Sequence, residues 1–306
     1  MNWGERVKKI SLKFFGFIIF FTFVGCNKEK TTSTPIVQGP LKCVPEKQLL
    51  AANIVGGQTV EANSTDSHKV VILYSSINDK DGELCTATPV ALNVLLTAAH
   101  CVDKADAAQS FAAFYTSLSC ESGFDVRKNA IKVTSFKIHP DYQRIDESSD
   151  KASAEGTQSD LALVFLETIV PAQYPIYKIA QAADVAVDST IYFYGYGVNS
   201  SNGGGSGYLR KTEFQRSQYQ IDESQNKISV DQTGGTGICS GDSGGPGLIE
   251  VNGELEILGV NSYVQGPKNN ICAGRGVLTL ADSYRSWISD EIRKQQQLSL
   301  SQVTSN

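Results

Sequence analysis

Short strand-like runs of apolar residues recur through most of this 306-residue chain, and they constrain the fold more than any other feature. Strands in globular proteins usually have about 3–10 residues, whereas helices need longer segments with a period of 3.6 residues. Many short strands in succession are typical of an all-β sandwich or barrel. The predicted strands are 70–76, 92–98, 111–118, 131–138, 161–166, 191–196, 227–231, 255–264 and 276–280.

Turn and helix signals add detail to this strand pattern. Asn252 and Gly253 lie between two β-prone arms and predict a hairpin, because a type I′ turn needs a positive φ at both central residues. Residues 282–296 have a helical pattern with Asp282 as its N-cap, and a Gln- and Ser-rich tail follows, so that we separate 293–306 as a polar tail. The polar stretches 145–160 and 199–207 predict exposed loops.

The first 25 residues have the pattern of a secretory signal. Arg6, Lys8, Lys9 and Lys13 precede an apolar run at 14–25. Such a run spans about 18 Å as a helix, well short of the roughly 30 Å hydrocarbon core, so a membrane-spanning helix is the weaker interpretation. We therefore expect 1–25 to be a signal peptide that directs export.

The signal ends in a pattern that bears on membrane attachment. Residues 23–26 (Phe-Val-Gly-Cys) resemble a bacterial lipobox, in which cleavage before the Cys leaves it lipid-modified, and this favours a lipid on Cys26. Phe23 stands where that motif prefers Leu, and an ordinary cleaved signal with a thiol at Cys26 is the alternative. The expectation is either a membrane-anchored lipoprotein, in a periplasm or at a cell surface, or a secreted protein.

Residues 26–53 differ in composition from the rest of the chain. They are polar, contain three prolines and lack apolar periodicity, so they read as a linker or propeptide. The net charge is -5, and residues 54–306 carry 19 Lys and Arg against 29 Asp and Glu. Nucleic acid is therefore excluded as an expected partner, because neutralising phosphates needs a basic face.

Three separate segments contain residues whose chemistry fits nucleophilic catalysis: 97–101 (Thr-Ala-Ala-His-Cys), 159–164 (Ser-Asp-Leu-Ala-Leu-Val) and 239–246 (Cys-Ser-Gly-Asp-Ser-Gly-Gly-Pro). A serine hydroxyl needs a base to take its proton, and a histidine with an ordinary pKa near 6.5 suits that role. A buried carboxylate can fix the imidazole tautomer, and glycines next to the serine leave backbone N–H groups free for an oxyanion. No zinc-type spacing occurs, so we expect no metal and no cofactor.

Together with residues 54–57 (Ile-Val-Gly-Gly), these segments resemble the trypsin/chymotrypsin family of serine endopeptidases. The resemblance runs from Ile54 to about residue 292 and implies two antiparallel Greek-key β-barrels packed face to face, with the active site in the cleft and a C-terminal α-helix. It assigns His100 as general base, Asp160 as its orienting partner and Ser243 as nucleophile. The N–H groups of Gly241 and Ser243 would form the oxyanion hole.

The resemblance also implies how the cysteines pair. Cys85 with Cys101 and Cys239 with Cys272 match bridges that the family usually has. Cys43 and Cys120 are left over, and the nearest family bridge joins a propeptide Cys to a position after the catalytic Asp, whereas Cys120 precedes Asp160. We nevertheless hypothesise a Cys43–Cys120 bridge, which would keep the processed chain attached to the segment that begins at Cys26.

By the same resemblance the protein is made as a zymogen. Cleavage before Ile54 would free an ammonium that pairs with Asp242 and orders the oxyanion loop. Asn53 precedes the cut, so a trypsin-like activator does not fit and the activating protease is unknown.

The specificity pocket would be lined by Gly237, Ile238, Ser262, Val264 and Gly276. Gly237 stands where trypsin-like members carry Asp, and Val264 narrows the slot. We expect small or medium aliphatic residues before the scissile bond, with bulkier apolar residues as the second choice.

Two other functions are alternatives to a peptidase. A catalytically inactive protease-fold protein that binds or adheres would not need His100, Asp160 and Ser243 together. An α/β-hydrolase esterase would need Gly-x-Ser-x-Gly with the histidine last in sequence, which this chain does not have. The expected partners are therefore peptide or protein substrates and the activating protease, with membrane contact only through a lipid on Cys26.

Overall fold

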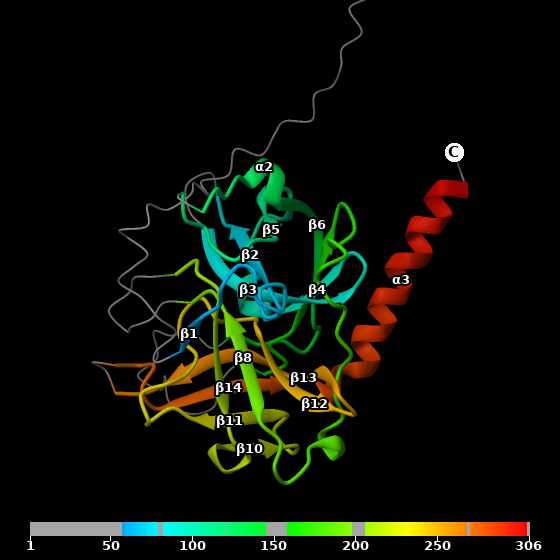
Figure 1. Cartoon of the computed structure of the whole chain (residues 1–306). Coiled ribbons are helices and arrows are strands. Elements are labelled where there is room, and N and C mark those ends of the chain that lie inside the picture. Colours follow the sequence, from blue (N-terminus) through cyan, green and yellow to red (C-terminus); the bar gives the residue numbers. More distant parts are fainter. Residues whose placement is uncertain are drawn as a thin grey trace, which may run out of the picture. The chain divides into compact units, whose positions relative to one another are not determined.

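The computed structural model describes residues 57–78, 82–120, 122–144, 158–197, 206–267 and 270–304 (Figure 1). Every described residue belongs to one compact unit, within Val37–Asn306. The predicted signal peptide, the 26–53 linker and most of both predicted loops lie outside the described residues, as do Cys26, Cys43 and Ile54.

Six strands close into an antiparallel barrel in the order β2-β3-β4-β7-β6-β5. The ring closes because β5 pairs with both β2 and β6. Strands β2, β4, β5 and β7 are buried along their whole length, which explains why they read as unbroken apolar runs. The strands are β2 (Val71–Ser76), β3 (Gly82–Ala91), β4 (Val94–Thr97), β5 (Phe111–Ala113), β6 (Ala130–Ile138) and β7 (Ala162–Leu166).

Eight strands form a second antiparallel sheet in the order β1-β9-β8-β12-β13-β14-β11-β10. The predicted hairpin is confirmed, because β12 and β13 pair across Asn252 and Gly253, whose φ angles are 53° and 83°. The strands are β1 (Gln58–Thr59), β8 (Ile191–Gly195), β9 (Arg210–Phe214), β10 (Tyr219–Asp222), β11 (Lys227–Asp231), β12 (Pro246–Val251), β13 (Glu254–Gln265) and β14 (Arg275–Leu280).

The barrel and the second sheet give the two-barrel, all-β architecture that the sequence predicted (Figure 1). The larger buried cluster contains side chains from both, among them Leu73 and Leu163 from the barrel and Tyr194 and Leu248 from the sheet. The two groups of strands therefore share this larger cluster, and a second, smaller cluster lies in the second sheet.

The C-terminal helix α3 (Arg285–Thr304) begins later and ends later than predicted. A 3-10 turn, η5 (Asp282–Tyr284), precedes it, and the Asp282 carboxylate accepts a hydrogen bond from the N–H of Ala182 at 2.9 Å instead of capping the helix. The predicted polar tail is helical through Thr304, because Gln, Lys and Leu have high helix propensities. Ile288 of α3 is buried, and Glu291 lies 3.8 Å from Lys137 on β6.

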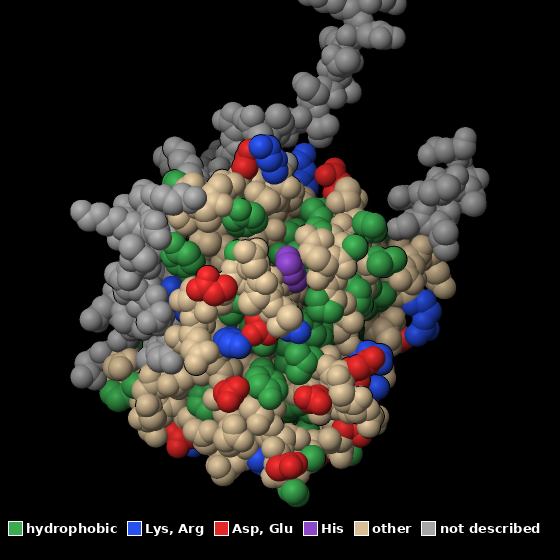
Figure 2. All heavy atoms as spheres, viewed as in Figure 1, with side chains coloured by type: hydrophobic (Ala, Val, Ile, Leu, Met, Phe, Trp, Pro, Cys, Tyr) green, Lys and Arg blue, Asp and Glu red, His purple; other side chains and the backbone are tan. Residues whose placement is uncertain are grey.

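The remaining helices are single turns. They are η1 (Ala99–Cys101), η2 (Ala107–Gln109), α2 (Val126–Asn129), η3 (Ala182–Asp184) and η4 (Arg216–Gln218). Within the described ranges, none of the helices combines the length and the apolar character that crossing a membrane requires. On the face shown in Figure 2, acidic and basic side chains are interspersed with apolar ones, and neither sign gathers into one patch.

Candidate active site

His100 lies in the 3-10 turn η1, directly after strand β4. Its neighbours Ala99 and Cys101 are buried and anchor the turn, whereas 20% of the His100 side chain remains exposed. A disulfide between Cys85 and Cys101 ties this turn to β3. The imidazole is thus held at the surface by a rigid backbone.

Asp160 is fully buried just before β7, the strand that pairs with β4, and this pairing brings its carboxylate next to His100. Its Oδ1 accepts a hydrogen bond from the backbone N–H of His100 at 2.9 Å, and its Oδ2 lies 2.8 Å from His100 Nδ1. Ser262 Oγ donates to the same Oδ2 at 2.5 Å. The carboxylate is therefore fixed by three bonds, which also fix the plane of the imidazole.

The electrostatics of this pair favour an ionised carboxylate. Burial would raise the pKa of Asp160, but His100 and the hydrogen bonds from His100 and Ser262 lower it below its ordinary value. Burial would likewise lower the pKa of His100, but the charge and hydrogen bond of Asp160 raise it above 6.5. Because Nδ1–H of the neutral imidazole donates to the Asp160 carboxylate, the free lone pair lies on Nε2.

A strained turn presents Asp160. Ser159 has a φ of 49°, in the left-handed region that residues other than glycine rarely adopt. The hydroxyls of Ser159 and Tyr284 lie 3.1 Å apart, and the N–H of Leu161 donates to the Ser159 carbonyl at 2.8 Å. This local network holds the unusual backbone in place.

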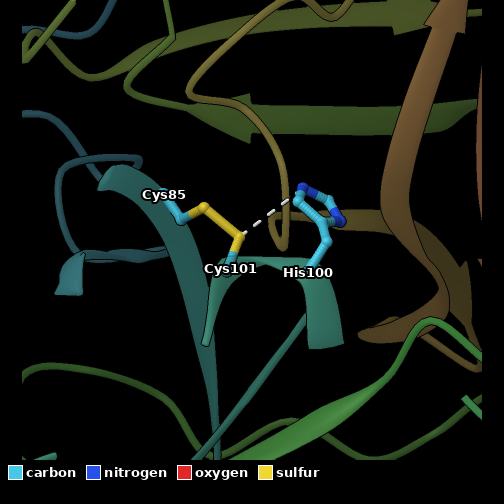
Figure 3. A group of neighbouring side chains, drawn as sticks. All are labelled: Cys85, His100 and Cys101. Carbon is cyan, nitrogen blue, oxygen red and sulfur yellow. Dashed lines mark hydrogen bonds between the residues drawn. A yellow bond between two sulfur atoms is a disulfide. The ribbon is translucent and has the colours of Figure 1, made fainter. Parts of the chain in front are cut away.

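Cys85, Cys101 and His100 lie close enough together to suggest a metal site (Figure 3). The two sulfur atoms are joined in a disulfide, however, and His100 Nε2 lies 3.8 Å from Cys101 Sγ. A cysteine binds a metal ion as a thiolate, and a disulfide sulfur carries no such negative charge. The cluster therefore stiffens the turn below the imidazole and does not bind a metal.

Ser243 lies in a tight loop that is hydrogen-bonded to both groups of strands. The Ser243 carbonyl accepts from the N–H of Thr86 on β3 at 2.8 Å, and the N–H of Gly244 donates to Asn261 of β13 at 2.8 Å. Gly244 has a φ of 78°, and a Cβ there would collide with Thr97 and with the Thr86 carbonyl. Only glycine therefore lets the Ser243 loop pack against the strands that lead to His100.

The backbone N–H groups of Gly241 and Ser243 and the Ser243 hydroxyl remain available. No described residue accepts a hydrogen bond from the N–H of Gly241 or Ser243, and none pairs with the Ser243 hydroxyl. Gly241 has a φ of 94°, and its carbonyl accepts from Thr86 Oγ1 at 3.0 Å. Two N–H groups that flank a serine in this way can bind an oxyanion.

Asp242 belongs to the same loop, directly before Ser243, and its side chain is buried. Its Oδ1 accepts from the N–H of Gly197 at 2.8 Å, and its Oδ2 accepts from the N–H of Cys239 at 2.9 Å. Burial nevertheless raises the pKa of Asp242 to about 6. Gly195 and Gly197 cradle the carboxylate, because a Cβ at either position would meet it.

Arg210 is a functional candidate that the sequence analysis missed. It is among the largest fully buried side chains of the described residues, and Nη1 donates to the Gly197 carbonyl at 3.1 Å. Burial lowers the pKa of Arg210, while the charge of Asp242 raises it. No local sequence pattern identifies Arg210, because its position depends on the pairing of β9 with β1, where it lies opposite Thr59.

The predicted pocket residues come together between β13, β14 and the segment before Ser243. Val264 pairs with Gly276 across β13 and β14, and Ile238 is buried beside them. Ser262 bonds to Asp160 through its side chain, in addition to its predicted place in the pocket. Gly237 and Gly276 were expected to leave room, but the side chain of Gln232 fills the space at both.

The disulfides follow the family pattern in part. Cys85–Cys101 and Cys239–Cys272 are both present, with Cα–Cα distances of 6.2 and 5.4 Å. Cys120 is also disulfide-bonded. Its predicted partner Cys43 lies outside the described residues, so that the pairing stays a prediction.

Comparison with known proteins gives one family. Residues 54–288 match the protein family described as Trypsin. Chymotrypsin-like elastase family member 1 of Canis lupus familiaris is 29% identical over 261 residues, which cover 81% of this chain and 95% of that relative. The Homo sapiens protein of the same name is 28% identical over 253 residues, which cover 79% of this chain and 93% of that relative.

Proposed function

The chain belongs to the trypsin family, and on that premise we propose that it is a serine endopeptidase which forms an acyl-enzyme on Ser243. One observation carries the proposal. The buried Asp160 carboxylate accepts two hydrogen bonds from His100 and one from Ser262. These bonds hold the imidazole beside the strands against which the Ser243 loop packs. A serine, a histidine base and an orienting carboxylate are the groups that acyl transfer requires.

The proposal assigns one role in the chemical steps to each of these residues. His100 Nε2 takes the proton of Ser243 Oγ as that oxygen attacks the substrate carbonyl carbon. The protonated imidazole then gives the proton to the leaving amine, the C–N bond breaks, and an ester on Ser243 remains. Water then attacks the ester carbon while His100 takes its proton. The bond from that carbon to Ser243 Oγ breaks, the acid leaves, and the imidazolium returns the proton to Ser243 Oγ. Asp160 stabilises the imidazolium through the 2.8 Å contact and stays ionised.

The developing negative charge would be held by the backbone N–H groups of Gly241 and Ser243. Both donors lie in a loop that Thr86 and Asn261 fix by hydrogen bonds, so little reorganisation accompanies the reaction.

We also propose that the enzyme is made as a zymogen and is activated by cleavage before Ile54. The Asp242 carboxylate supports this proposal. It is buried and its pKa is raised, so the positive charge of Arg210 does not fully offset the cost of burial. A new ammonium at Ile54 would supply that charge. Because Asn53 precedes the cut, the activator belongs to a class that does not require Lys or Arg there.

For the substrate we propose a small or medium aliphatic residue before the scissile bond. Gly237 offers no carboxylate to an Arg or Lys side chain, and Val264 narrows the slot opposite Gly276. The matched relatives are named as elastase-like, which agrees with this choice. The substrate itself would be a peptide or protein outside the cytoplasm.

We propose that the chain is exported through residues 1–25, as a bacterial lipoprotein anchored at Cys26 or as a secreted protein. A Cys43–Cys120 bridge would keep the cut enzyme attached to that anchor, and the disulfide at Cys120 supports it. Gels of the cut protein with and without reductant test this proposal. Retention of the 26–53 peptide until reduction is expected, and its release without reductant would contradict the bridge.

Peptide hydrolysis by the full chain, cut before Ile54, tests the peptidase proposal. We expect hydrolysis after Ala or Val in short peptide anilides, and a loss of about 10⁴-fold or more in Ser243→Ala. The matched control is His68→Ala, since His68 contacts Tyr174 away from the site. Absence of hydrolysis in the cut wild-type protein, with intact folding, would favour the inactive binding protein instead.

A further inference from the structure

Gln232 occupies the end of the specificity pocket. Its side chain is 1% exposed, and it lies where β11 ends, next to the loop that leads to Ser243. A Cβ added at Gly237 would meet Gln232 Cδ, and a Cβ added at Gly276 would meet Gln232 Oε1. The carboxamide therefore fills the space that the two glycines leave open.

Hydrogen bonds hold this carboxamide in one position. Oε1 accepts from the N–H of Ile238 at 2.9 Å, and Nε2 donates to the carbonyls of Ile238 and Cys272 at 3.1 and 2.8 Å. The Gln232 backbone N–H also donates to Gly274 at 2.8 Å. Both Nε2 protons are thus used within the protein, and the side chain connects the two chain segments that form the pocket walls.

We infer that Gln232 is the floor of the specificity pocket and restricts it to small aliphatic side chains. This inference rests on the proposed peptidase function. A substrate side chain that reaches the floor meets a neutral amide oxygen with no free N–H beside it, so a carboxylate finds no donor there and a cation finds no opposite charge. A bulky apolar side chain would need the volume that Gln232 fills.

The same geometry explains why the pocket residues alone are misleading. Gly237 and Gly276 by themselves predict a deep pocket, because neither has a side chain. Val230 pairs with Gly276 across β11 and β14. Two residues later in the chain, the Gln232 side chain enters the space between Gly237 and Gly276. The floor is therefore set by a residue seven positions before Cys239 in the sequence and not by the walls themselves.

Substrate profiles of the cut, full-length enzyme test this inference. The readout is the ratio of kcat/KM for Phe, Leu and Val against Ala at the position before the scissile bond. Gln232→Ala should raise the Phe-to-Ala ratio about tenfold or more, because one methylene in such a pocket changes discrimination by about 10–200-fold. Gln225→Ala is the matched control, since Gln225 is exposed in the turn between β10 and β11, and its ratios should match the wild type.

Two further variants guard against loss of folding. Gln232→Asn keeps the amide and removes one methylene, so it should shift the ratio in the same direction. Gln232→Met keeps the volume and loses the three hydrogen bonds, so it should keep the preference for Ala and Val. Reaction of Ser243 with methanesulfonyl fluoride, which places no large group in the pocket, reports whether each variant retains an assembled site.

A stability measurement gives an independent result. Gly276→Ala should lower the melting temperature of the wild type, because its Cβ meets Gln232 Oε1, and should lower it less in Gln232→Ala. Equal losses in both backgrounds, together with unchanged ratios in Gln232→Ala and Gln232→Asn, would overturn the inference. Absence of hydrolysis by the wild type would instead contradict the peptidase proposal.

Discussion

Ser262 Oγ donates a 2.5 Å hydrogen bond to Asp160 Oδ2, the same oxygen that lies 2.8 Å from His100 Nδ1. The pairing joins β13 of the second sheet to the end of the barrel just before β7. A residue predicted to bind substrate thus also positions the carboxylate that orients the imidazole.

Ser262→Ala removes this bond. We expect kcat/KM to fall about tenfold, because a hydrogen bond to a charged group is worth about 1.5–3 kcal/mol and only part of that acts on the transition state. The pKa of Asp160 should rise, since Ser262 helps to lower it. Initial rates of peptide hydrolysis measure the effect, with Ser289→Ala on the exposed face of α3 as control. Unchanged rates would contradict this role.

The pKa of His100 makes the activity pH-dependent. Hydrolysis needs the neutral imidazole, so kcat/KM should rise with pH through an apparent pKa above 6.5. Because the pKa is raised in the folded state, the ion pair with Asp160 contributes stability that is complete below about pH 6.5 and lost as the pH rises through the raised pKa. In Asp160→Asn both effects that Asp160 has on the imidazole are weakened, so burial, the largest influence, should bring the pKa of His100 below its wild-type value. NMR titration of the His100 ring checks this, and a value at or below 6.5 in the wild type would be inconsistent with the pairing.

Cleavage before Ile54 should change the pH dependence of stability through Asp242. In the uncut chain the pKa of Asp242 is raised to about 6 from 3.8, so the associated stability is present below 3.8 and lost as the pH rises through about 6. The loss corresponds to about 3 kcal/mol. A new ammonium beside Asp242 should reduce that loss in the cut chain. Melting temperatures of both forms between pH 4 and pH 8 measure it, and Asp242→Asn should remove the difference. Identical profiles for the cut and uncut wild type would contradict the pairing.

Arg210 should be coupled to Asp242 through Gly197, which donates its N–H to Asp242 and accepts from Arg210. Arg210→Met should raise the pKa of Asp242 above about 6 and destabilise the protein at pH 8 by about 3 kcal/mol, because it leaves a buried charge without its neighbour. The loss should be smaller in Asp242→Asn. A double-mutant cycle of unfolding free energies measures the coupling, with Lys211→Met as the half-exposed control next in sequence. Additive losses would show that the two side chains do not interact.

The strand pattern predicted the fold because buried strands leave a local signal. The unbroken apolar runs of β2 and β7 were found with small errors at their ends. Strand β3 was missed because it contains Gly82 and Pro89, which local rules place outside strands. In the structure Pro89 lies at a register shift between β3 and β4, where a missing N–H is tolerated. A strand was predicted over 111–118, but strand β5 ends at Ala113.

The site could be predicted from sequence only where the chemistry is local. The segments around His100, Asp160 and Ser243 carry their own patterns, and the structure joins His100 to Asp160 directly. Gln232 and Arg210 carry no such pattern. Their positions depend on strand register, since Val230 pairs with Gly276 and Thr59 pairs with Arg210. Such long-range pairing cannot be read from neighbouring residues.

Covalent labelling at Ser243 tests the central claim most directly. The cut protein is treated with diisopropyl fluorophosphate, digested and analysed by mass spectrometry. We predict one adduct per chain, on Ser243, and at least about a 10³-fold slower reaction in His100→Ala because the base is removed. A wild-type protein that remains unlabelled, or that is labelled at a different residue, would contradict a nucleophile at Ser243 activated by His100.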